Sequence, residues 1–439
     1  MNKFLESKVT LIFLGVFCLI LLIAITIYHS NKPTILEVGI FAGSNWDVAN
    51  ADSYLVIDKV VARFEEEHPG VKVQYVSGIR KEDYSEWYAQ KLLEGKAPDV
   101  AMVLSEDFNR LAFLHVLVDL DEMMDSDQDF ERDQYYSTAI ESGLYKGDQY
   151  ALPYEVVPQL MCVNRTLLEQ EGFDMSSIEW SWDEFYEISN QITRDTDGDD
   201  VIDQFGVCNY TWKEAANSNG SHLFNDDGTV SYIADETVME AIRFTSQLLD
   251  LNQEQTVTQE DFNAGKVAFM PLSYAEYRTY KRYPYRIKKY SNFKWDVTTL
   301  PAGSQGDNTS EVESLLMGIS SSSKQKDLAW ELLKLFTYDE EIQLEIFNSS
   351  QGASVLKSVI NSKQSQEILQ EDLDVNEKSI DSALLGTIIE QGIVMPKFQK
   401  YDEAMVFIDS GIQSIINEKK DINSSIKILQ RDINKFLIQ

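Results

Sequence analysis

The chain has few of the residue types that carry out most enzyme chemistry. Its 439 residues include only three cysteines and four histidines. It contains no Gly-x-Ser-x-Gly, His-Glu-x-x-His or P-loop pattern. Acidic residues are abundant, but no spacing singles out a pair of carboxylates suited to glycoside hydrolysis. The sequence therefore favours a protein that is not an enzyme, and an enzyme stays an alternative only because so many acids are present.

Basic residues are also scarce relative to acidic ones. The chain has 38 Lys and Arg against 72 Asp and Glu, a formal net charge of −34. A nucleic acid is itself a polyanion and would be repelled, so we expect no nucleic-acid partner. The hydrophobic fraction of 44% supplies apolar material for sizeable cores. The length suggests two or three domains.

The three cysteines are Cys18, Cys162 and Cys208. They form no Cys-x-x-Cys pair and have no histidine at metal-binding spacing, so a cysteine-based metal site is not expected. Cys162 and Cys208 each lie in a short apolar stretch that is typical of a strand. They are either two buried small hydrophobic residues or, if the strands are neighbours, a disulfide.

Long apolar runs are absent except at the N-terminus. Residues 9–28 read VTLIFLGVFCLILLIAITIY, which contains no charge and is long enough to span a bilayer as a helix. A cleaved signal peptide usually has a shorter apolar core and an Ala-x-Ala site, which is not found here. We therefore expect residues 1–30 to form an uncleaved membrane anchor, with a removed signal as the alternative. Either way, the rest of the chain is predicted to lie outside the cell, at the extracellular face of the membrane or secreted.

After this run the sequence alternates between strand and helix patterns. Strands are predicted at 35–43, 71–76 and 99–104, and amphipathic helices at 54–67 and 84–94. This order is typical of an α/β fold with a mostly parallel sheet covered by helices. Ligands of such sheets bind at the carboxyl ends of the strands. The segments that follow the first and third strands are thus candidate ligand-facing loops.

Several segments, in order along nearly the whole exported region, resemble those of one family. They are FEEEHPGVKV, GKAPDVAMV, YKGDQYALPYEV with LMCVNRTLLEQEG, WSWDEFYEI, FNAGKVAFM and DLAWELLKLFTYDEE. Each segment alone is a weak signal, but their order and spacing together are specific. The chain resembles the extracellular solute-binding proteins of ABC-type importers, the carbohydrate-oriented family that includes maltose-binding protein.

The resemblance implies a two-lobe α/β fold of the periplasmic-binding-protein type II, whose lobes are joined by hinge strands and close over a ligand. By analogy the chain crosses between lobes near 151–157, near 270–273 and around Tyr338. Residues 36–150 and 272–338 would then form the first lobe, and residues 151–271 and 339–439 the second. The implied function is capture of a carbohydrate, either a sugar or an oligosaccharide, in the cleft between the lobes and its delivery to the permease subunits of an ABC transporter. A ligand sensor that signals to a membrane receptor kinase is the alternative.

A sugar site needs aromatic rings for the apolar faces of the ligand and carboxylates or amides for its hydroxyl groups. The sequence places such mixtures at the predicted cleft edges. The candidate ligand-binding residues are Asn45, Trp46, Asp47, Glu106, Asp107, Tyr154, Glu155, Tyr210, Trp212, Tyr274, Glu276 and Arg278. Trp182 belongs to a different pattern, because Ser181 and Glu184 form a capping box at the start of a helix that Trp182 would anchor.

The stretch DTDGDDVID at residues 195–203 matches the first part of an EF-hand calcium loop. It departs from that loop at position 6, which is Asp200 rather than glycine, and at position 12, which is Gly206 rather than glutamate. A strand rather than a helix is predicted to follow, so a calcium sensor is not expected. We predict a fixed structural Ca²⁺ here, with a metal-free acidic turn as the alternative. Its predicted ligands are Asp195, Asp197, Asp199, the carbonyl of Val201, and Asp203.

Overall fold

The computed structural model describes residues 33–439 except residues 49, 51–53, 174–179, 254, 282–292 and 371–379. The predicted N-terminal anchor, residues 1–30, lies outside the described residues, and so does Cys18. Among the helices of the described residues, none is long and apolar enough to cross a membrane.

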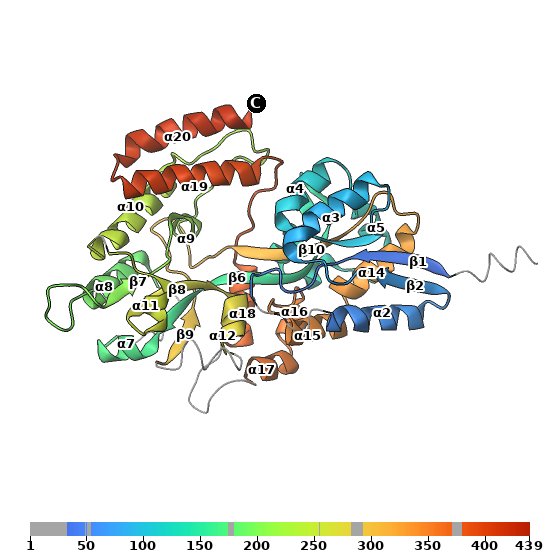
Figure 1. The fold of residues 1–439 in the computed structure, drawn as a ribbon, viewed down its shortest axis with the longest axis horizontal. Helices are drawn as coiled ribbons and strands as arrows, with labels where there is room; N and C mark the ends of the chain where they lie inside the picture. Colours follow the sequence, from blue (N-terminus) through green and yellow to red (C-terminus); the bar gives the residue numbers. More distant parts are fainter. Residues whose placement is uncertain are drawn as a thin grey trace, which may run out of the picture.

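Within the described residues, an eight-stranded sheet runs through the length of the molecule (Figure 1). Its strands follow the order β2-β1-β3-β10-β6-β8-β7, and β9 also pairs with β6. The pairings β1–β2, β1–β3 and β7–β8 are parallel, as the alternation of strands and helices predicts, whereas β10 is antiparallel to both of its neighbours. The strands are β1 (Thr34–Gly39), β2 (Val71–Tyr75), β3 (Val100–Val103), β6 (Leu152–Asn164), β7 (Phe205–Val207), β8 (Val267–Ser273), β9 (Trp295–Thr298) and β10 (Val312–Ile319). A separate hairpin consists of β4 (Leu144–Tyr145) and β5 (Asp148–Gln149).

Strand β6 connects the two halves of this sheet. Its first half pairs with β10 as far as Pro158, and its second half, from Gln159 onward, pairs with β8 and β9. Proline has no N–H to donate, so it is tolerated where the ladder changes partner. Pro158 lies at this change. The segment near 151–157, where the resemblance implies a crossing, thus lies in a single continuous strand in the middle of the sheet.

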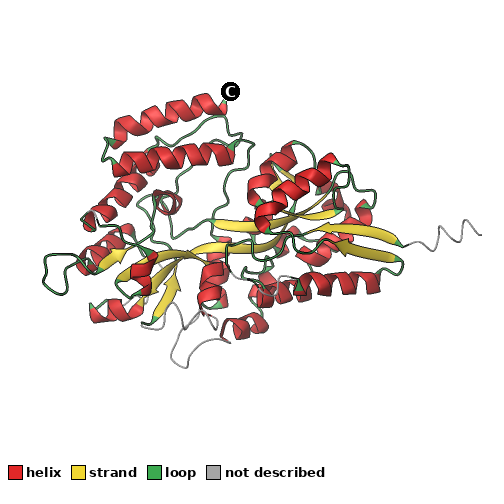
Figure 2. Cartoon of the chain, viewed as in Figure 1, coloured by secondary structure: helices red, strands yellow, loops and turns green. Residues whose placement is uncertain are grey.

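Helices cover both faces of the sheet (Figure 2). The first half of the chain contributes α2 (Leu55–Glu67), α3 (Lys81–Leu93), α4 (Ser105–Phe113), α5 (Asp121–Ser126), α6 (Ser137–Glu141), α7 (Arg165–Gln170), α8 (Trp182–Ile192) and α9 (Trp212–Ser218). The helices predicted at 54–67 and 84–94 are confirmed by α2 and α3. Helix α8 begins with the predicted capping box, in which Ser181 and Glu184 bond each other's backbone N–H groups. Trp182 is buried and stacks on Phe244, with ring centroids 4.3 Å apart.

The second half of the chain is largely helical after β10. It contributes α10 (Glu236–Leu251), α11 (Gln259–Asn263), α12 (Tyr274–Lys281), α14 (Lys326–Thr337), α15 (Glu340–Ser349), α16 (Lys357–Ile360), α17 (Lys363–Gln370), α18 (Ser382–Glu390), α19 (Tyr401–Asn417) and α20 (Ile422–Leu437). Figure 1 shows α19 and α20 side by side, far from the end of the sheet that β1 and β2 occupy.

The C-terminal helices divide between the two ends of the molecule. Helix α15 packs against α2 and α14, and Tyr338 contacts the rings of Phe130 and Tyr135. Helices α19 and α20 instead pack against α10. The chain passes from one group to the other through residues 391–400, which lie between α18 and α19. One large apolar core extends along β6 across both halves of the sheet, so the predicted lobe boundaries stay a prediction.

Cys162 and Cys208 are both buried and both free. Cys162 lies on β6 and Cys208 directly follows β7, and β8 lies between these two strands. In this structure the two cysteines are therefore small buried core residues and do not form a disulfide with each other.

Candidate functional site

A cavity of about 350 Å³ opens where β6 and β10 meet the helices α9 and α19. Its wall combines aromatic, amide and charged side chains, which is the mixture that a polar small molecule requires. The lining residues are Gln159, Trp212, Lys213, Glu214, Ala216, Asn217, Leu223, Leu300, Glu311, Glu313, Met395, Tyr401 and Met405. The strands and helices that build this cavity come from distant parts of the chain.

Glu311 and Glu313 bracket the first residue of β10. Side chains two positions apart in extended backbone point to the same side, so both carboxylates face the cavity that both residues line. Neither side chain has a hydrogen bond or an ion pair within the described part of the chain. Burial, followed by the neighbouring charges of Glu313 and Glu214, raises the pKa of Glu311 to about 7. Burial also raises the pKa of Glu313.

Charged groups from both ends of the molecule surround Glu313. Lys81 of α3 and Lys397 of the 391–400 segment attract its charge, whereas Glu106 of α4 and Asp47 repel it. Glu313 is exposed, yet protein charges act on it from several directions. This carboxylate therefore stands in a cleft between the helices that follow β2 and β3 and the segment that leads to α19.

Lys397 attracts the charges of both Glu311 and Glu313. Burial lowers the pKa of its ammonium, while Asp402, Glu311 and Glu313 act in the opposite direction. The ammonium also lies 5.6 Å from the ring centroid of Phe108, on α4. Lys397 thus lies over a ring of α4, and the charge of Asp402, at the start of α19, also acts on it.

The aromatic residues of the cavity are held by neighbours. Trp212 is fully buried, and its indole N–H donates to Asp409 at 2.9 Å. Tyr401 packs edge-on against Phe224 and Phe398. These contacts fix the orientation of the two rings on the side of the cavity that α9 and α19 form. Trp212 was predicted as a ligand contact, and it lines the cavity, whereas Tyr210 is buried against Phe185.

The candidate residues after β1 form a tighter group on the other side of β10. The indole N–H of Trp46 donates to Glu155 at 2.7 Å, and Glu155 is buried and also accepts a hydrogen bond from Ser350. Burial raises the pKa of this carboxyl. Asn45, Tyr154 and Glu155 line a narrow space of about 30 Å³, which leaves no room for a sugar in this conformation.

The remaining candidates around α4 and β3 differ in exposure. Asp47 is exposed, has a positive φ of 55° and pairs with Lys81 at 3.4 Å. Glu106 is exposed on the side that faces Glu313 and Asp402. Asp107 is buried and binds Arg110 at 2.7 Å and the hydroxyl of Ser85 at 2.5 Å. Of these three, Asp47 and Glu106 lie near the cleft, and Asp107 makes contacts within the protein.

The candidates that follow β8 make contacts inside the protein. Tyr274 is fully buried and stacks on Tyr277. Glu276 accepts hydrogen bonds from the N–H and the hydroxyl of Ser273 and so caps α12. Arg278 is buried and donates to the carbonyl of Phe347 at 2.6 Å. These three residues have structural roles in the fold, and their contact with a ligand stays a prediction.

The predicted calcium loop lies between α8 and β7. The carboxylates of Asp195, Asp197 and Asp199 offer oxygens that all lie within 4.8 Å of one another. Asp195 accepts the N–H groups of Gly198 and Asp200, which lowers its pKa, and repulsion from Asp199 raises the pKa of Asp197. The carboxylate of Asp203 accepts the N–H and hydroxyl of Thr196, both at 2.8 Å.

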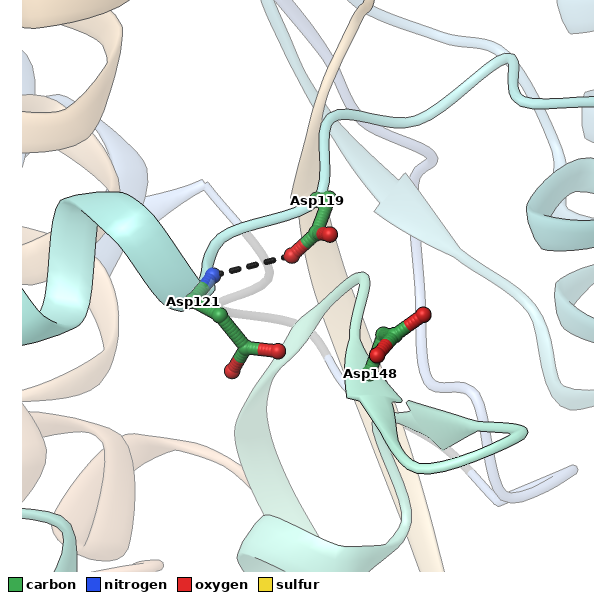
Figure 3. A group of neighbouring side chains, drawn as sticks. All are labelled: Asp119, Asp121 and Asp148. Carbon is green, nitrogen blue, oxygen red and sulfur yellow. Dashed lines mark hydrogen bonds between the residues drawn. The ribbon is translucent and has the colours of Figure 1, made fainter.

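A second group of carboxylates, which the sequence did not single out, lies near the β4–β5 hairpin. Asp119, Asp121 and Asp148 approach one another there (Figure 3), and Asp119 accepts the N–H of Asp121 at 3.0 Å. Asp121 also pairs with Arg132. This pairing already neutralises part of the charge of the group.

Comparison with known families decides the class of protein. A family model described as Bacterial extracellular solute-binding protein matches residues 49–343, more than half of the chain. The chain belongs to the bacterial extracellular solute-binding protein family. The predicted resemblance is thus confirmed. A comparison with curated proteins finds no match.

Solved structures show the fold of this solute-binding protein. A cyclic α-maltosyl-1,6-maltose binding protein of Arthrobacter globiformis has 15% identity, a TM-score of 0.76, and coverage of 92% of this chain and 99% of its own. The sugar-binding protein MalE of Xanthomonas citri has 16% identity, a TM-score of 0.74, and coverage of 92% and 98%. An ABC substrate-binding protein of Listeria monocytogenes, in complex with cycloalternan, has 19% identity, a TM-score of 0.68, and coverage of 92% and 99%. The predicted two-lobe α/β fold is confirmed.

Sequence reasoning missed the residues of the solute-binding protein that line the cavity most directly. Glu311 and Glu313 lie at the polar start of β10, before its apolar run, and Gln159 lies within β6. Their signal is the alternation Glu-Val-Glu just before an apolar run, which marks the polar start of a strand. Tyr401 and Lys397 gave no local signal, because only the fold brings the entrance of α19 to β10.

Proposed function

We propose that this solute-binding protein captures a carbohydrate in the cleft beside β10 and delivers it to the permease of an ABC transporter. The observation that carries the proposal is the cavity in which Trp212 and Tyr401 stand beside Gln159, Asn217 and the carboxylates. Aromatic faces pack on the C–H surface of a sugar ring, and amides and carboxylates bond its hydroxyl groups. Structural neighbours include a cyclo/maltodextrin-binding protein and proteins with maltose or mannotriose bound, which supports a sugar as the ligand here.

The proposal covers binding and release, without a chemical reaction. The two lobes, with the boundaries predicted from the sequence, would close around the sugar and present a closed surface to the permease. Nothing in the comparisons favours the signalling alternative, so transport is the function that we propose.

A thermal-shift screen of the full-length protein against neutral mono- and oligosaccharides tests the sugar proposal. A ligand at 100 times its Kd should add about 2.7 kcal/mol to the free energy of unfolding. A shift with a member of the sugar panel, and no change in that sugar on chromatography, supports capture without turnover. Shifts confined to peptides or amino acids would contradict the choice of ligand.

We propose that residues 1–30 anchor the protein at the extracellular face of the membrane. The proposal rests on the twenty uncharged residues at 9–28. Fractionation of cells should place the protein with the membranes, and N-terminal sequencing should begin at or near Met1. Protein found only in the culture medium, beginning after residue 28, would favour a removed signal.

We propose a structural Ca²⁺ at the 195–203 loop. Three carboxylates that converge within 4.8 Å repel one another, and a divalent cation would offset this repulsion. Addition of Ca²⁺ to chelator-treated protein should raise the Tm, and an Asp197→Asn, Asp199→Asn double variant should lose this response. An equal response in wild type and variant would favour the metal-free turn.

A further inference from the structure

The cavity beside β10 has more negative charge than a neutral sugar would require. Glu214, Glu311 and Glu313 line it, and Lys213 is the one cation in its wall within the described residues. Lys213 reaches instead toward Asp409, with 3.7 Å between the ammonium and the carboxylate. Lys397 and Lys81, which are not among the lining residues, also attract these charges, but neither forms an ion pair with Glu311 or Glu313 within the described residues.

The two carboxylates of Glu311 and Glu313 are also without partners. Neither accepts a hydrogen bond from a neighbour in the described chain, whereas Glu214 accepts the N–H of Thr211 at 2.8 Å in the cap of α9. Glu311 is half-buried, so its unpaired carboxylate loses part of its solvation by water. A sugar hydroxyl could donate to such a group but would leave the repulsion between the two charges in place.

A cationic ligand would remove both costs at once. An ammonium group donates three hydrogen bonds, and its positive charge would offset the repulsion between the two carboxylates. The aromatic residues Trp212 and Tyr401, which line the same cavity, also suit a cation. The strongly negative net charge of the whole chain, −34, would attract such a ligand from solution.

We propose that the saccharide bound by this protein carries an amino group, and that Glu311 and Glu313 hold its ammonium in the cavity beside β10. This inference rests on the proposed sugar-binding function and narrows its ligand class to amine-bearing saccharides. Glu214 and Gln159 border the same space and would accept hydrogen bonds from hydroxyl groups of the sugar ring.

Calorimetric titration of the full-length protein at pH 7 with matched ligands tests the inference. One set compares β-1,4-linked glucosamine dimers and trimers with their N-acetylated forms, and another compares 6-amino-6-deoxymaltose with maltose. In each pair the ring scaffold is kept and the ammonium is replaced by a neutral group, an acetamide in the first set and a hydroxyl in the second. We expect the amine form to bind at least tenfold more tightly in one or more pairs, and this preference to weaken at high salt.

Variants assign the effect to the two carboxylates. Glu311→Gln and Glu313→Gln should each reduce the affinity for the amine form at least fivefold and change that for the neutral form less than threefold. Equal losses for both forms would indicate a purely structural role and would overturn the assignment. Glu66→Gln, at an exposed position of α2, is the matched control and should change neither affinity.

The outcomes separate this inference from the function on which it rests. Neutral members that bind as tightly as their amine partners would overturn the amino-saccharide inference and leave the sugar proposal in place. Binding of spermidine with no saccharide bound, amine-bearing or neutral, would overturn both.

Discussion

Glu311 is the residue at which stability and function are expected to oppose each other. Its raised pKa means that the folded protein holds a proton more firmly than the unfolded chain does. A side chain that weakens the fold is retained most easily where it contacts a ligand. Several charged or titratable groups act on Glu311. They are Glu313 of β10, Glu214 and Lys213 of α9, Lys397 of the 391–400 segment and Tyr401 of α19.

The substitution Glu311→Gln should stabilise the free protein at alkaline pH. Between the ordinary pKa near 4.5 and the folded value of about 7, the folded state binds more protons, so wild-type stability falls as the pH rises through this window. We expect the variant to exceed wild type by about 2 kcal/mol at pH 8 and the difference to shrink at pH 4.5. Urea unfolding at both values measures this, and an unchanged difference would contradict it.

Trp46 is expected to act mainly through its hydrogen bond to the buried Glu155. Trp46→Phe keeps most of the ring but removes the N–H that donates at 2.7 Å. The loss leaves a buried carboxylate less satisfied, which should cost about 1–3 kcal/mol. Trp87→Phe is the matched control, because Trp87 is also half-buried and its known contacts are made by the ring. Equal losses in denaturant unfolding would mean that packing, and not this bond, dominates.

At the scale of elements, helix starts were among the features most predictable from the sequence. The box formed by Ser181 and Glu184 is local, so four residues are enough to identify it. The strands β2 and β3 and the helices α2 and α3 were predictable for a similar reason, since their apolar periodicity lies within one segment.

Ser181→Ala tests the strength of this local signal. Loss of the hydroxyl that accepts the N–H of Glu184 should lower the free energy of unfolding by about 1 kcal/mol. Ser77→Ala, at an exposed loop position, should change stability by less than about 0.5 kcal/mol. A loss below that limit for Ser181→Ala would show that packing of Trp182 alone fixes the start of α8.

The candidate site was less predictable than the elements that carry it. A position at the end of a strand does not reveal whether a side chain turns toward the cleft or into the core. Tyr274 and Arg278 were chosen for such positions and are buried, whereas Trp212 and Glu106 lie at or near the cleft. The pair Glu311 and Glu313 faces the cavity because β10 lies between β3 and β6 in the sheet. The paired residues of these strands are more than 150 positions apart in the sequence, so no local pattern reveals the arrangement.

At the scale of the whole molecule, the cleft joins groups that belong to different ends of the sheet. Glu106 and Phe108 of α4 act on Asp402 and Lys397, which precede or begin α19. Between these ends run β6, β10 and the 391–400 segment. A ligand that contacts both sides of the cleft would shift the equilibrium between an open and a closed arrangement of the protein toward the closed one. The size of this shift equals the difference between the binding free energies of the ligand for the closed and the open arrangement.

Ligand binding should therefore shorten the distance between α3 and α20. Spin labels at Leu93→Cys and Lys427→Cys, both exposed, would report it by pulsed electron resonance once Cys18 is replaced by serine. Cys162 and Cys208 are buried and should not react with the label. We expect the distance distribution to shorten and narrow with a saturating saccharide, as hinge closure requires. The pair Leu93→Cys and Glu66→Cys, on α3 and α2, should stay unchanged, and a ligand that binds without altering the first pair would exclude closure as the mechanism of capture.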